Sequence, residues 1–251
     1  VVTGLTFGTN GFYLPFTNAS ALGEDFSGED NDFTANNLTS IDQSTDSPSN
    51  NFSTLSPLAL SPDRQVLSDG NLTGTSSDWD SSVSTIAVTT GKWFAEMKCA
   101  SGTGNGMIAG VIDASDLTLV TGATSGLGFT TNSVGYANNG VRYIADVSAS
   151  YGASFADNDI IGIALDMTSA TKTVTFYKNG VSQGAISLPT AGTLTFFLGC
   201  STSNGTTSMN FGNPPYAISS GNADANGFGN FEYAVPTGYF SLCTNNLNIL
   251  E

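Results

Sequence analysis

The chain has 251 residues, of which 39% are hydrophobic and only 11% are charged. This length suits one large domain or two small ones, and the apolar fraction supports a core, which argues against wholesale disorder. The formal net charge is −15, with six Lys and Arg residues against 21 acidic residues. Nucleic acids and anionic membranes attract clustered cations, and the six cations here are scattered, so we expect neither partner.

The side chains offer little catalytic chemistry. The chain has no histidine, so neither a Ser–His nor a Cys–His pair can form. Cys99, Cys200 and Cys243 are far apart and form no CxxC motif, and we interpret them as buried free thiols. No apolar run approaches the roughly 20 residues of a membrane-spanning helix, and we expect no signal peptide at the start of the chain.

Residues 1–77 form a segment rich in Asn, Asp, Ser and Thr, with isolated aromatic residues. Turn-forming residues at this density favour ordered loops and short strands. We expect one strand near residues 12–16. We expect the rest to be a loop-rich N-terminal flank that packs on a β-sandwich through its aromatic and leucine side chains.

One acidic run within this flank, EDFSGEDND at residues 24–32, is a candidate metal site. Oxygen ligands at short spacing suit Ca²⁺, which makes Asp25, Asp30 and Asp32 the candidate ligands. The run resembles the Asp-x-Ser-Gly-x-x-Asn-Asp turn of laminin-G-like sandwiches. The alternative is an Asx-rich turn whose side chains satisfy their own backbone. We favour the turn, and therefore expect no cofactor.

Residues 78–216 change to short strands separated by turn residues, which is typical of an all-β fold with two packed antiparallel sheets. The apolar alternation in KWFAEMK, DIIGIALD and TVTFYK predicts which side chains point into the core. These are Trp93, Ala95, Met97, Ile161, Ile163, Leu165, Val174 and Phe176. DIIGIALD is apolar on both faces, so we expect a central strand that is covered on both sides. Asn179-Gly180 can form a tight hairpin turn.

Residues 217–251 are rich in Gly and Asn and contain five aromatic residues that look like packing anchors. We see no linker that would define a second domain. We expect this C-terminal flank to complete the same domain as residues 78–216.

The central segment resembles the SPRY-domain family. The similar stretches occur in family order and are GKWFAEMK, MIAGVIDAS, SVGYANNG, DIIGIALDMTSATKTVTFYKNG and SMNFGNPPY, which together span roughly residues 78–216. The resemblance implies a concanavalin-like jelly-roll sandwich that serves mainly in protein recognition. SPRY domains bind through variable loops, so the resemblance assigns no binding residue by position.

The flanks resemble segments of virion proteins of tailed bacteriophages, particularly tail fibres. The similar stretches are GTNGFYLPFTNASALGEDFSGEDNDFTANNL and DSPSNNFSTLSPL near the start and GFGNFEYAVPTGYFSLCTNNL near the end. The resemblance implies a structural or adsorption protein of the virion, such as a tail fibre, a spike or a capsid decoration. It also implies a homo-oligomer whose partners are other virion proteins and a host-surface glycan or protein.

Four aromatic residues in or beside turn-rich stretches are candidate binding residues: Trp79, Tyr136, Tyr143 and Tyr151. Exposed aromatic rings with Asn and Asp neighbours can stack on sugars or form hot spots for a protein partner. The alternative for each ring is ordinary packing in the core or at its rim.

The leading hypothesis is a non-enzymatic virion protein. One alternative is a polysaccharide-degrading enzyme on the same fold, because two carboxylates can hydrolyse a glycoside. Its usual Glu-x-Asp-x-x-Glu arrangement is absent, since Glu96 is followed by Met97 and Lys98. A second alternative is a free-standing lectin-like or protein-binding module. We expect Asp157, Asp159 and Asp166 to be structural, with Asp166 capping the turn after its strand.

Overall fold

The computed structural model describes residues 4–43, 46, 47, 49–60, 64–102, 104, 106–119 and 126–250. The chain divides into two compact units, Val1–Thr45 and Asp46–Glu251, which we call the N-terminal unit and the sandwich unit. The described residues of the N-terminal unit contain one short 3-10 helix, η1 (Ser40–Asp42), and no strand. The strand predicted at residues 12–16 was wrong. Phe16 has a φ of 56°, and the Tyr13 N–H binds Asp25 instead of a neighbouring strand.

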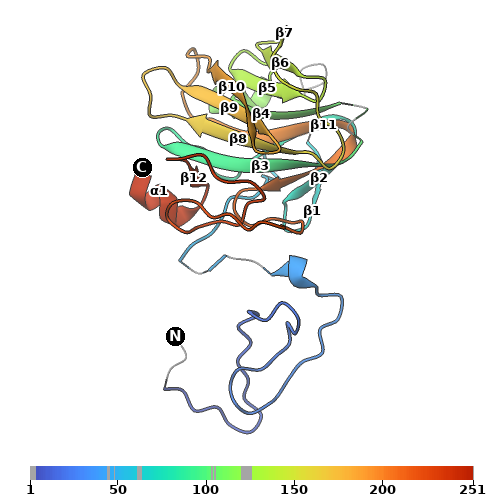
Figure 1. Cartoon of the computed structure of the whole chain (residues 1–251), viewed down its shortest axis with the longest axis vertical. Helices are drawn as coiled ribbons and strands as arrows, with labels where there is room; N and C mark the ends of the chain where they lie inside the picture. The colour runs from blue at the N-terminus through green and yellow to red at the C-terminus, as the bar shows by residue number, and fades with distance from the viewer. Residues whose placement is uncertain are drawn as a thin grey trace. The chain divides into compact units, whose positions relative to one another are not determined.

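The regular secondary structure of the sandwich unit consists almost entirely of strands (Figure 1). They are β1 (Val66–Ser68), β2 (Thr73–Val83), β3 (Lys92–Ser101), β4 (Met107–Asp113), β5 (Ser133–Ala137), β6 (Val141–Ile144), β7 (Val147–Ser150), β8 (Ile160–Asp166), β9 (Thr173–Lys178), β10 (Val181–Ser187), β11 (Phe196–Asn210) and β12 (Phe240–Ser241). The 3-10 helix η3 (Ala114–Leu119) follows β4, and the α-helix α1 (Thr244–Leu250) ends the described chain. The boundary expected between residues 77 and 78 falls inside β2.

All twelve strands belong to one continuous sheet, in the order β10-β9-β8-β3-β11-β4-β5-β6-β7 with β2 on the other edge of β11. Every pairing is antiparallel except the short one between β12 and β3. Strand β11 joins two layers, because its first half pairs with β4 and its second half pairs with β3. A register irregularity between Ser203 and Gly205 separates the halves. The predicted all-β antiparallel sandwich is confirmed, and its two layers are parts of one curled sheet.

The main core lies between the two layers and contains every inward-facing residue that the alternation predicts. Tyr136 on β5 and Phe176 on β9 meet across it, with 5.6 Å between ring centroids. Residues on β3, β4, β8 and β11 make up more than half of the other buried members of this core. Because apolar burial is the main favourable term in folding, this interlayer core holds the sandwich unit together.

The outer faces of both layers are also covered, as predicted for DIIGIALD. Strands β4 and β8 are buried along their whole length. Phe231, from the C-terminal flank, packs on Phe94 and Ala164 outside one layer. Leu127 packs on Ile108 and Ile112 outside the other layer.

The C-terminal flank lies in the sandwich unit and adds β12 and α1 to it. The sequence analysis did not predict α1, because seven residues are too few to show helical periodicity. The three cysteines are buried and free, as predicted. Within the described part of the chain, no helix has the length and apolarity needed to cross a bilayer.

The hairpin turn between β9 and β10 is the one that the sequence predicts. Asn179 and Gly180 have φ values of 48° and 79°, and Lys178 pairs with Val181 across the turn. Two successive positive φ angles are typical of the tight hairpin turn that Asn-Gly favours.

Candidate interaction surface

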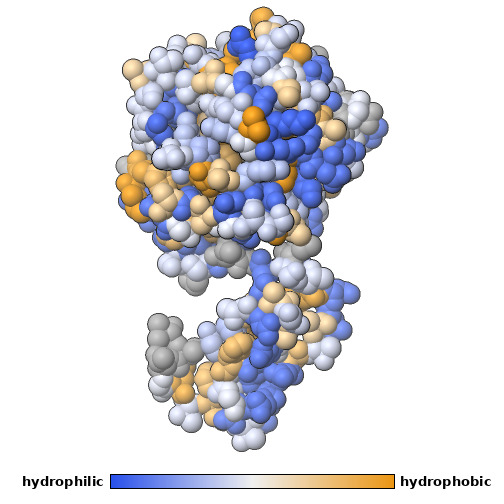
Figure 2. Space-filling view, viewed as in Figure 1, coloured by the Kyte–Doolittle hydropathy of each residue, from blue (hydrophilic) through white to orange (hydrophobic). Residues whose placement is uncertain are grey.

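The N-terminal unit exposes most of the large apolar side chains found at the surface. Eleven large hydrophobic residues are exposed among the described residues, and six of them lie in this unit. These six are Leu5, Phe12, Phe16, Phe26, Phe33 and Leu38. Figure 2 shows apolar and hydrophilic residues interspersed over the unit. The other five are spread over the much larger sandwich unit: Leu58, Val66, Val147, Val181 and Ile249.

These side chains stay exposed because the described residues of the unit form no sheet, and their one helix, η1, is a single short turn. Phe12 and Phe33 contact each other edge to face at 4.9 Å, yet each remains about half exposed, at 51% and 50%. Several large apolar side chains exposed on one small folded unit are typical of an interaction site.

The Asp25 carboxylate organises the backbone of the N-terminal unit. Its Oδ1 accepts the N–H of Tyr13 at 2.7 Å and of Ser27 at 2.8 Å. Its Oδ2 accepts the Ser27 hydroxyl at 2.6 Å and the Asn31 N–H at 3.0 Å. Burial alone would raise the pKa of Asp25, but these hydrogen bonds outweigh it and hold the pKa at about 2.

The structure places the three candidate calcium ligands in this turn. Asp25 Oδ1 accepts two N–H groups, Oδ2 accepts one N–H and one O–H, and Asp32 Oδ1 accepts the Asp25 N–H at 2.8 Å. Asp30 has a φ of 55°, a conformation that suits a turn. The described residues contain no group of three or more acidic, His or Cys side chains placed to hold a metal. The favoured interpretation, an Asx-rich turn that binds no calcium, stays a prediction, and a calcium titration followed by thermal melting tests it.

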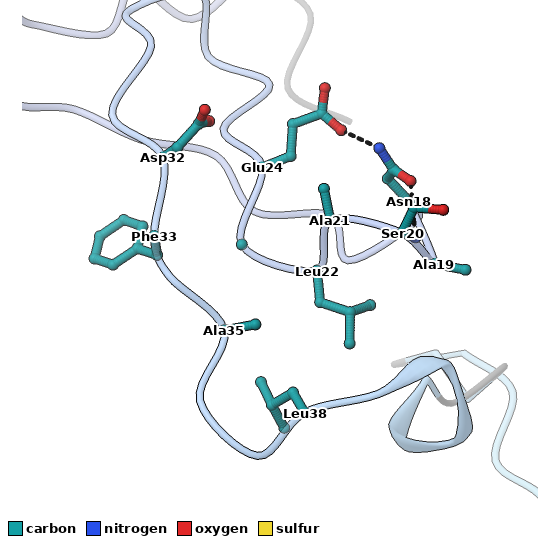
Figure 3. A pocket seen from close by; sticks show the side chains of 11 residues that line it. Asn18, Ala19, Ser20, Ala21, Leu22, Glu24, Asp32, Phe33, Ala35 and Leu38 are labelled. Atoms are coloured by element: carbon teal, nitrogen blue, oxygen red, sulfur yellow. Dashed lines mark hydrogen bonds between the residues drawn. The ribbon is translucent and has the colours of Figure 1, made fainter.

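A cavity of about 440 Å³ opens in the N-terminal unit. Figure 3 shows Glu24 and Asp32 toward one end of it and Leu22, Ala35 and Leu38 toward the other. The Asn18 amide donates to the Glu24 carboxylate at 2.5 Å. Residues 1–45 contain six acidic residues and no Lys or Arg, so both the cavity and the exposed apolar side chains lie in acidic surroundings.

Two of the four candidate binding aromatics lie together on the sandwich unit. Trp79 and Tyr143 both contact Phe129, with ring centroids 6.0 Å and 4.9 Å from it. All three rings are partly exposed and pack over the outer face of the layer that contains β4. Phe129 was not among the candidates predicted from the sequence, although its turn-rich context (GFTTN) resembles theirs.

The other two candidates contribute to the interlayer core. Tyr136 is fully buried, with its ring 5.1 Å from both Phe155 and Tyr151, and its hydroxyl donates to the Ala153 carbonyl. A ligand could reach the Tyr136 ring only if the core opened. Tyr151 is partly buried, and its hydroxyl donates to the Gly184 carbonyl at 2.5 Å.

Glu96, the carboxylate named for the enzyme alternative, lies buried on the outer face of β3. Its Oε1 accepts the Tyr233 N–H at 2.8 Å, and its Oε2 accepts the Glu232 N–H at 3.0 Å and the Asn210 amide at 3.2 Å. The side chain is 0% exposed, so neither water nor a glycan reaches it. The hydrogen bonds between Glu96 and residues 232–233 were not predicted from the sequence. The alternation in β3 indicates that Glu96 lies on the second face of the strand, but it does not indicate which segment packs on that face.

The aspartates that bracket β8 have structural partners. Asp166 pairs with Lys92 at 3.0 Å and accepts the N–H groups of Thr168 and Ser169, so it caps the turn as predicted. Asp159 pairs with Lys178 at 3.2 Å and accepts the Asn179 amide at 2.6 Å.

Comparison with known proteins agrees with the resemblance of the central segment. Residues 101–214 match the model of the SPRY domain. No relative was found among curated proteins. A human SPRY domain of known structure is 19% identical, covers 62% of this chain and 98% of its own, and has a TM-score of 0.46. The SPRY domain of human HERC1 is 18% identical, covers 58% and 91%, and has a TM-score of 0.47.

The family match covers somewhat less than half of the chain and starts within β3. It leaves both flanks unassigned, and nothing among these similarities indicates a bacteriophage. The comparisons thus show a similarity of residues 101–214 to the SPRY domain, within a longer unit of antiparallel strands.

Proposed function

We propose that this chain is a non-enzymatic binding and assembly protein of a virion, and that its N-terminal unit makes the principal contacts. The observation that carries the proposal is the concentration of exposed Phe and Leu side chains in that unit. The SPRY match at residues 101–214 supports a protein-binding role in general. The virion context is supported by the resemblance of the two flanks to proteins of tailed bacteriophages.

The charge of the N-terminal unit indicates the kind of partner. With six acidic residues and no cation, the unit complements a protein surface that has apolar grooves rimmed by Lys and Arg. The same charge disfavours nucleic acid, an anionic membrane and a second copy of the same face. The homo-oligomer that the fibre resemblance implies would therefore not pair this face with its own copy.

The first experiment asks whether the exposed aromatic side chains carry the contacts. Phe12, Phe16, Phe26 and Phe33 are changed together to Ser, and incorporation of the chain into gradient-purified particles is measured by immunoblot. A matched control changes Val66, Val147 and Val181, which are exposed on the sandwich unit, to Ser. We expect the Phe variant alone to be lost from particles. Equal incorporation of both variants would contradict the role of the N-terminal unit, and a chain absent from all particles would contradict the virion context.

Recognition of a glycan or protein through Trp79, Phe129 and Tyr143 is a second candidate function, because three contacting, partly exposed rings form a stacking surface. Changing Trp79 to Ala should abolish binding to host-surface preparations while particle incorporation remains. Unchanged binding would exclude this surface.

The enzyme alternative has a direct assay. Host-surface polysaccharide incubated with the chain should release no reducing ends, because Glu96 is buried and committed to hydrogen bonds. Turnover that disappears in Glu96→Gln would overturn the non-enzymatic proposal.

A further inference from the structure

Residues 231–239 form a strap across the outer face of β3 and β8. Phe231 packs on Phe94 and Ala164, and Val235 and Tyr239 pack around the same cluster. The strap is fixed at both ends: Phe231 exchanges two backbone hydrogen bonds with Asn222, and the chain enters β12 beside β3 at residue 240. Figure 1 shows this last part of the chain, in red, beside β3.

Between these two ends, two carboxylates hold the strap. Glu232, in the strap itself, accepts the N–H and the hydroxyl of Ser219, and its carbonyl accepts the Ser220 hydroxyl and the Asn222 amide. Glu96 holds the strap to β3. Glu96 accepts the two successive backbone N–H groups of Glu232 and Tyr233, and the Asn210 amide that also binds Glu96 donates to the Asn230 carbonyl at 2.9 Å. The side chain of Tyr233 then rests on the β9–β10 turn, where a Cβ on Gly180 would lie 2.8 Å from its ring. Glu96 thus connects β3, the end of β11 and the strap.

The charge of Glu96 has no cationic partner at ion-pair distance within the described chain. The two ion pairs found there are Lys92–Asp166 and Lys178–Asp159. The titratable and charged groups around Glu96 are Glu232 and Tyr233 on the strap, Tyr216 after β11, Tyr177 on β9 and Lys98 on its own strand. Lys98 lies over the Tyr216 ring, 5.0 Å from its centroid.

Burial is the largest influence on this carboxyl. It raises the pKa of Glu96 from its usual 4.5 to about 7, against the hydrogen bonds from Tyr233, Glu232 and Asn210, and the nearby Glu232 charge adds to the rise. The charge of Glu96 therefore changes near neutral pH.

We propose that residues 231–239 are a releasable strap, and that Glu96 is its proton-controlled clamp, closed when Glu96 is protonated and weakened when it is ionised. Release uncovers the apolar face formed by Phe94, Ala164 and Tyr177. When Glu96 is protonated, its neutral carboxyl still accepts hydrogen bonds. When Glu96 is ionised, it is a buried charge without a counter-ion, and burying such a charge costs free energy.

The direction of the pH effect follows from proton binding. The closed form binds the Glu96 proton more tightly than an open form in which the carboxyl is solvated with its usual pKa of 4.5. The strap is thus most stable below pH 4.5 and loses stability as the pH rises through about 7. Opening should become up to roughly 100-fold more favourable between pH 5 and pH 9.

The test uses the full chain. NMR follows the Glu96 side-chain carboxyl carbon from pH 4 to 9, and amide exchange of Glu232 and Tyr233, corrected for the intrinsic rate at each pH, measures strap opening. We expect a carboxyl midpoint near neutral pH and an opening constant that rises with the same midpoint. Glu96→Gln should remove this rise, whereas Glu29→Gln, an exposed carboxylate of the N-terminal unit, should keep it.

Two outcomes would overturn the proposal. One is a wild-type carboxyl midpoint below pH 5, which needs no variant and therefore decides the case even if Glu96→Gln misfolds. The other is an opening constant for Glu232 and Tyr233 that does not change with pH in the wild-type chain. As a positive control for release, Phe231→Ala should open the strap at every pH, because it removes the apolar contact with Phe94.

Discussion

At the residue scale, aspartates in this protein serve as loop organisers. Asp25, Asp113, Asp166 and Asp224 each accept at least four hydrogen bonds from nearby donors, mostly backbone N–H groups and hydroxyls. A carboxylate suits this role because its two oxygens accept several hydrogen bonds at once. Part of the acidic composition is therefore explained by aspartates whose carboxylates fix the conformation of the long loops.

Asp166 gives the first prediction. Burial alone would raise its pKa, but the contacts with Lys92, Thr168 and Ser169 outweigh burial and hold the pKa below the usual range. Asp166→Asn should lower the free energy of unfolding at pH 7 by roughly 1–3 kcal/mol. The difference should shrink as the pH falls below about 4, because the stabilisation from a depressed pKa is lost when the wild-type carboxylate is protonated.

Urea denaturation at pH 7 and at pH 3 measures this difference. Asp146→Asn is the control, because Asp146 is exposed and has a φ of 64°, which Asn adopts readily. An Asp166→Asn variant as stable as Asp146→Asn at pH 7 would show that the cap contributes nothing.

At the scale of elements, the β9–β10 hairpin joins a local turn to the distant strap. Gly180 needs its positive φ of 79°, and it also leaves room for the Tyr233 ring. Gly184 in the same hairpin has a φ of 102° and nothing within 4 Å of the position of a Cβ. A substitution at Gly184 would therefore introduce backbone strain alone, whereas one at Gly180 would introduce strain and a steric clash with Tyr233.

The second prediction compares Ala at these two positions. Both variants should lose stability through strain, and Gly180→Ala should lose roughly 1–2 kcal/mol more because its Cβ collides with Tyr233. Adding Tyr233→Ala should remove most of the extra loss in a double-mutant cycle measured by thermal melting. Equal losses at the two glycines would place Tyr233 away from the turn.

Strand alternation predicted which residues face the interior of the sandwich. It did not predict which residues pack on the outer faces of the two layers. Residues 93, 95 and 97 and their partners on β8 and β9 followed from the two-residue period. The same period cannot say that Phe231 covers Phe94, since that contact joins residues far apart in the chain. Tyr136 shows that a turn-rich sequence context does not predict exposure. It was a candidate binding residue for that reason, yet its side chain is fully buried.

At the scale of the whole molecule, the division at residue 45 gives the third prediction. A chain of residues 46–251 should fold by itself, with its strand content intact by circular dichroism, because the interlayer core draws its residues from that unit. Its melting midpoint should change by less than about 2 °C from that of the full chain. A larger drop would support the packing of the N-terminal flank on the sandwich that the sequence analysis predicts.

Strand β11 has a consequence for the order in which the molecule forms. It is the last long strand in the sequence, yet it supplies the partner edge for β2, β3 and β4. During synthesis, the edge of each of these three strands that pairs with β11 stays unpaired until residue 210 has emerged from the ribosome. Long-range pairing of this kind slows folding and leaves unpaired edges prone to aggregation. A nascent chain that stops before residue 196 would expose all three edges at once and would depend on chaperones to stay in solution.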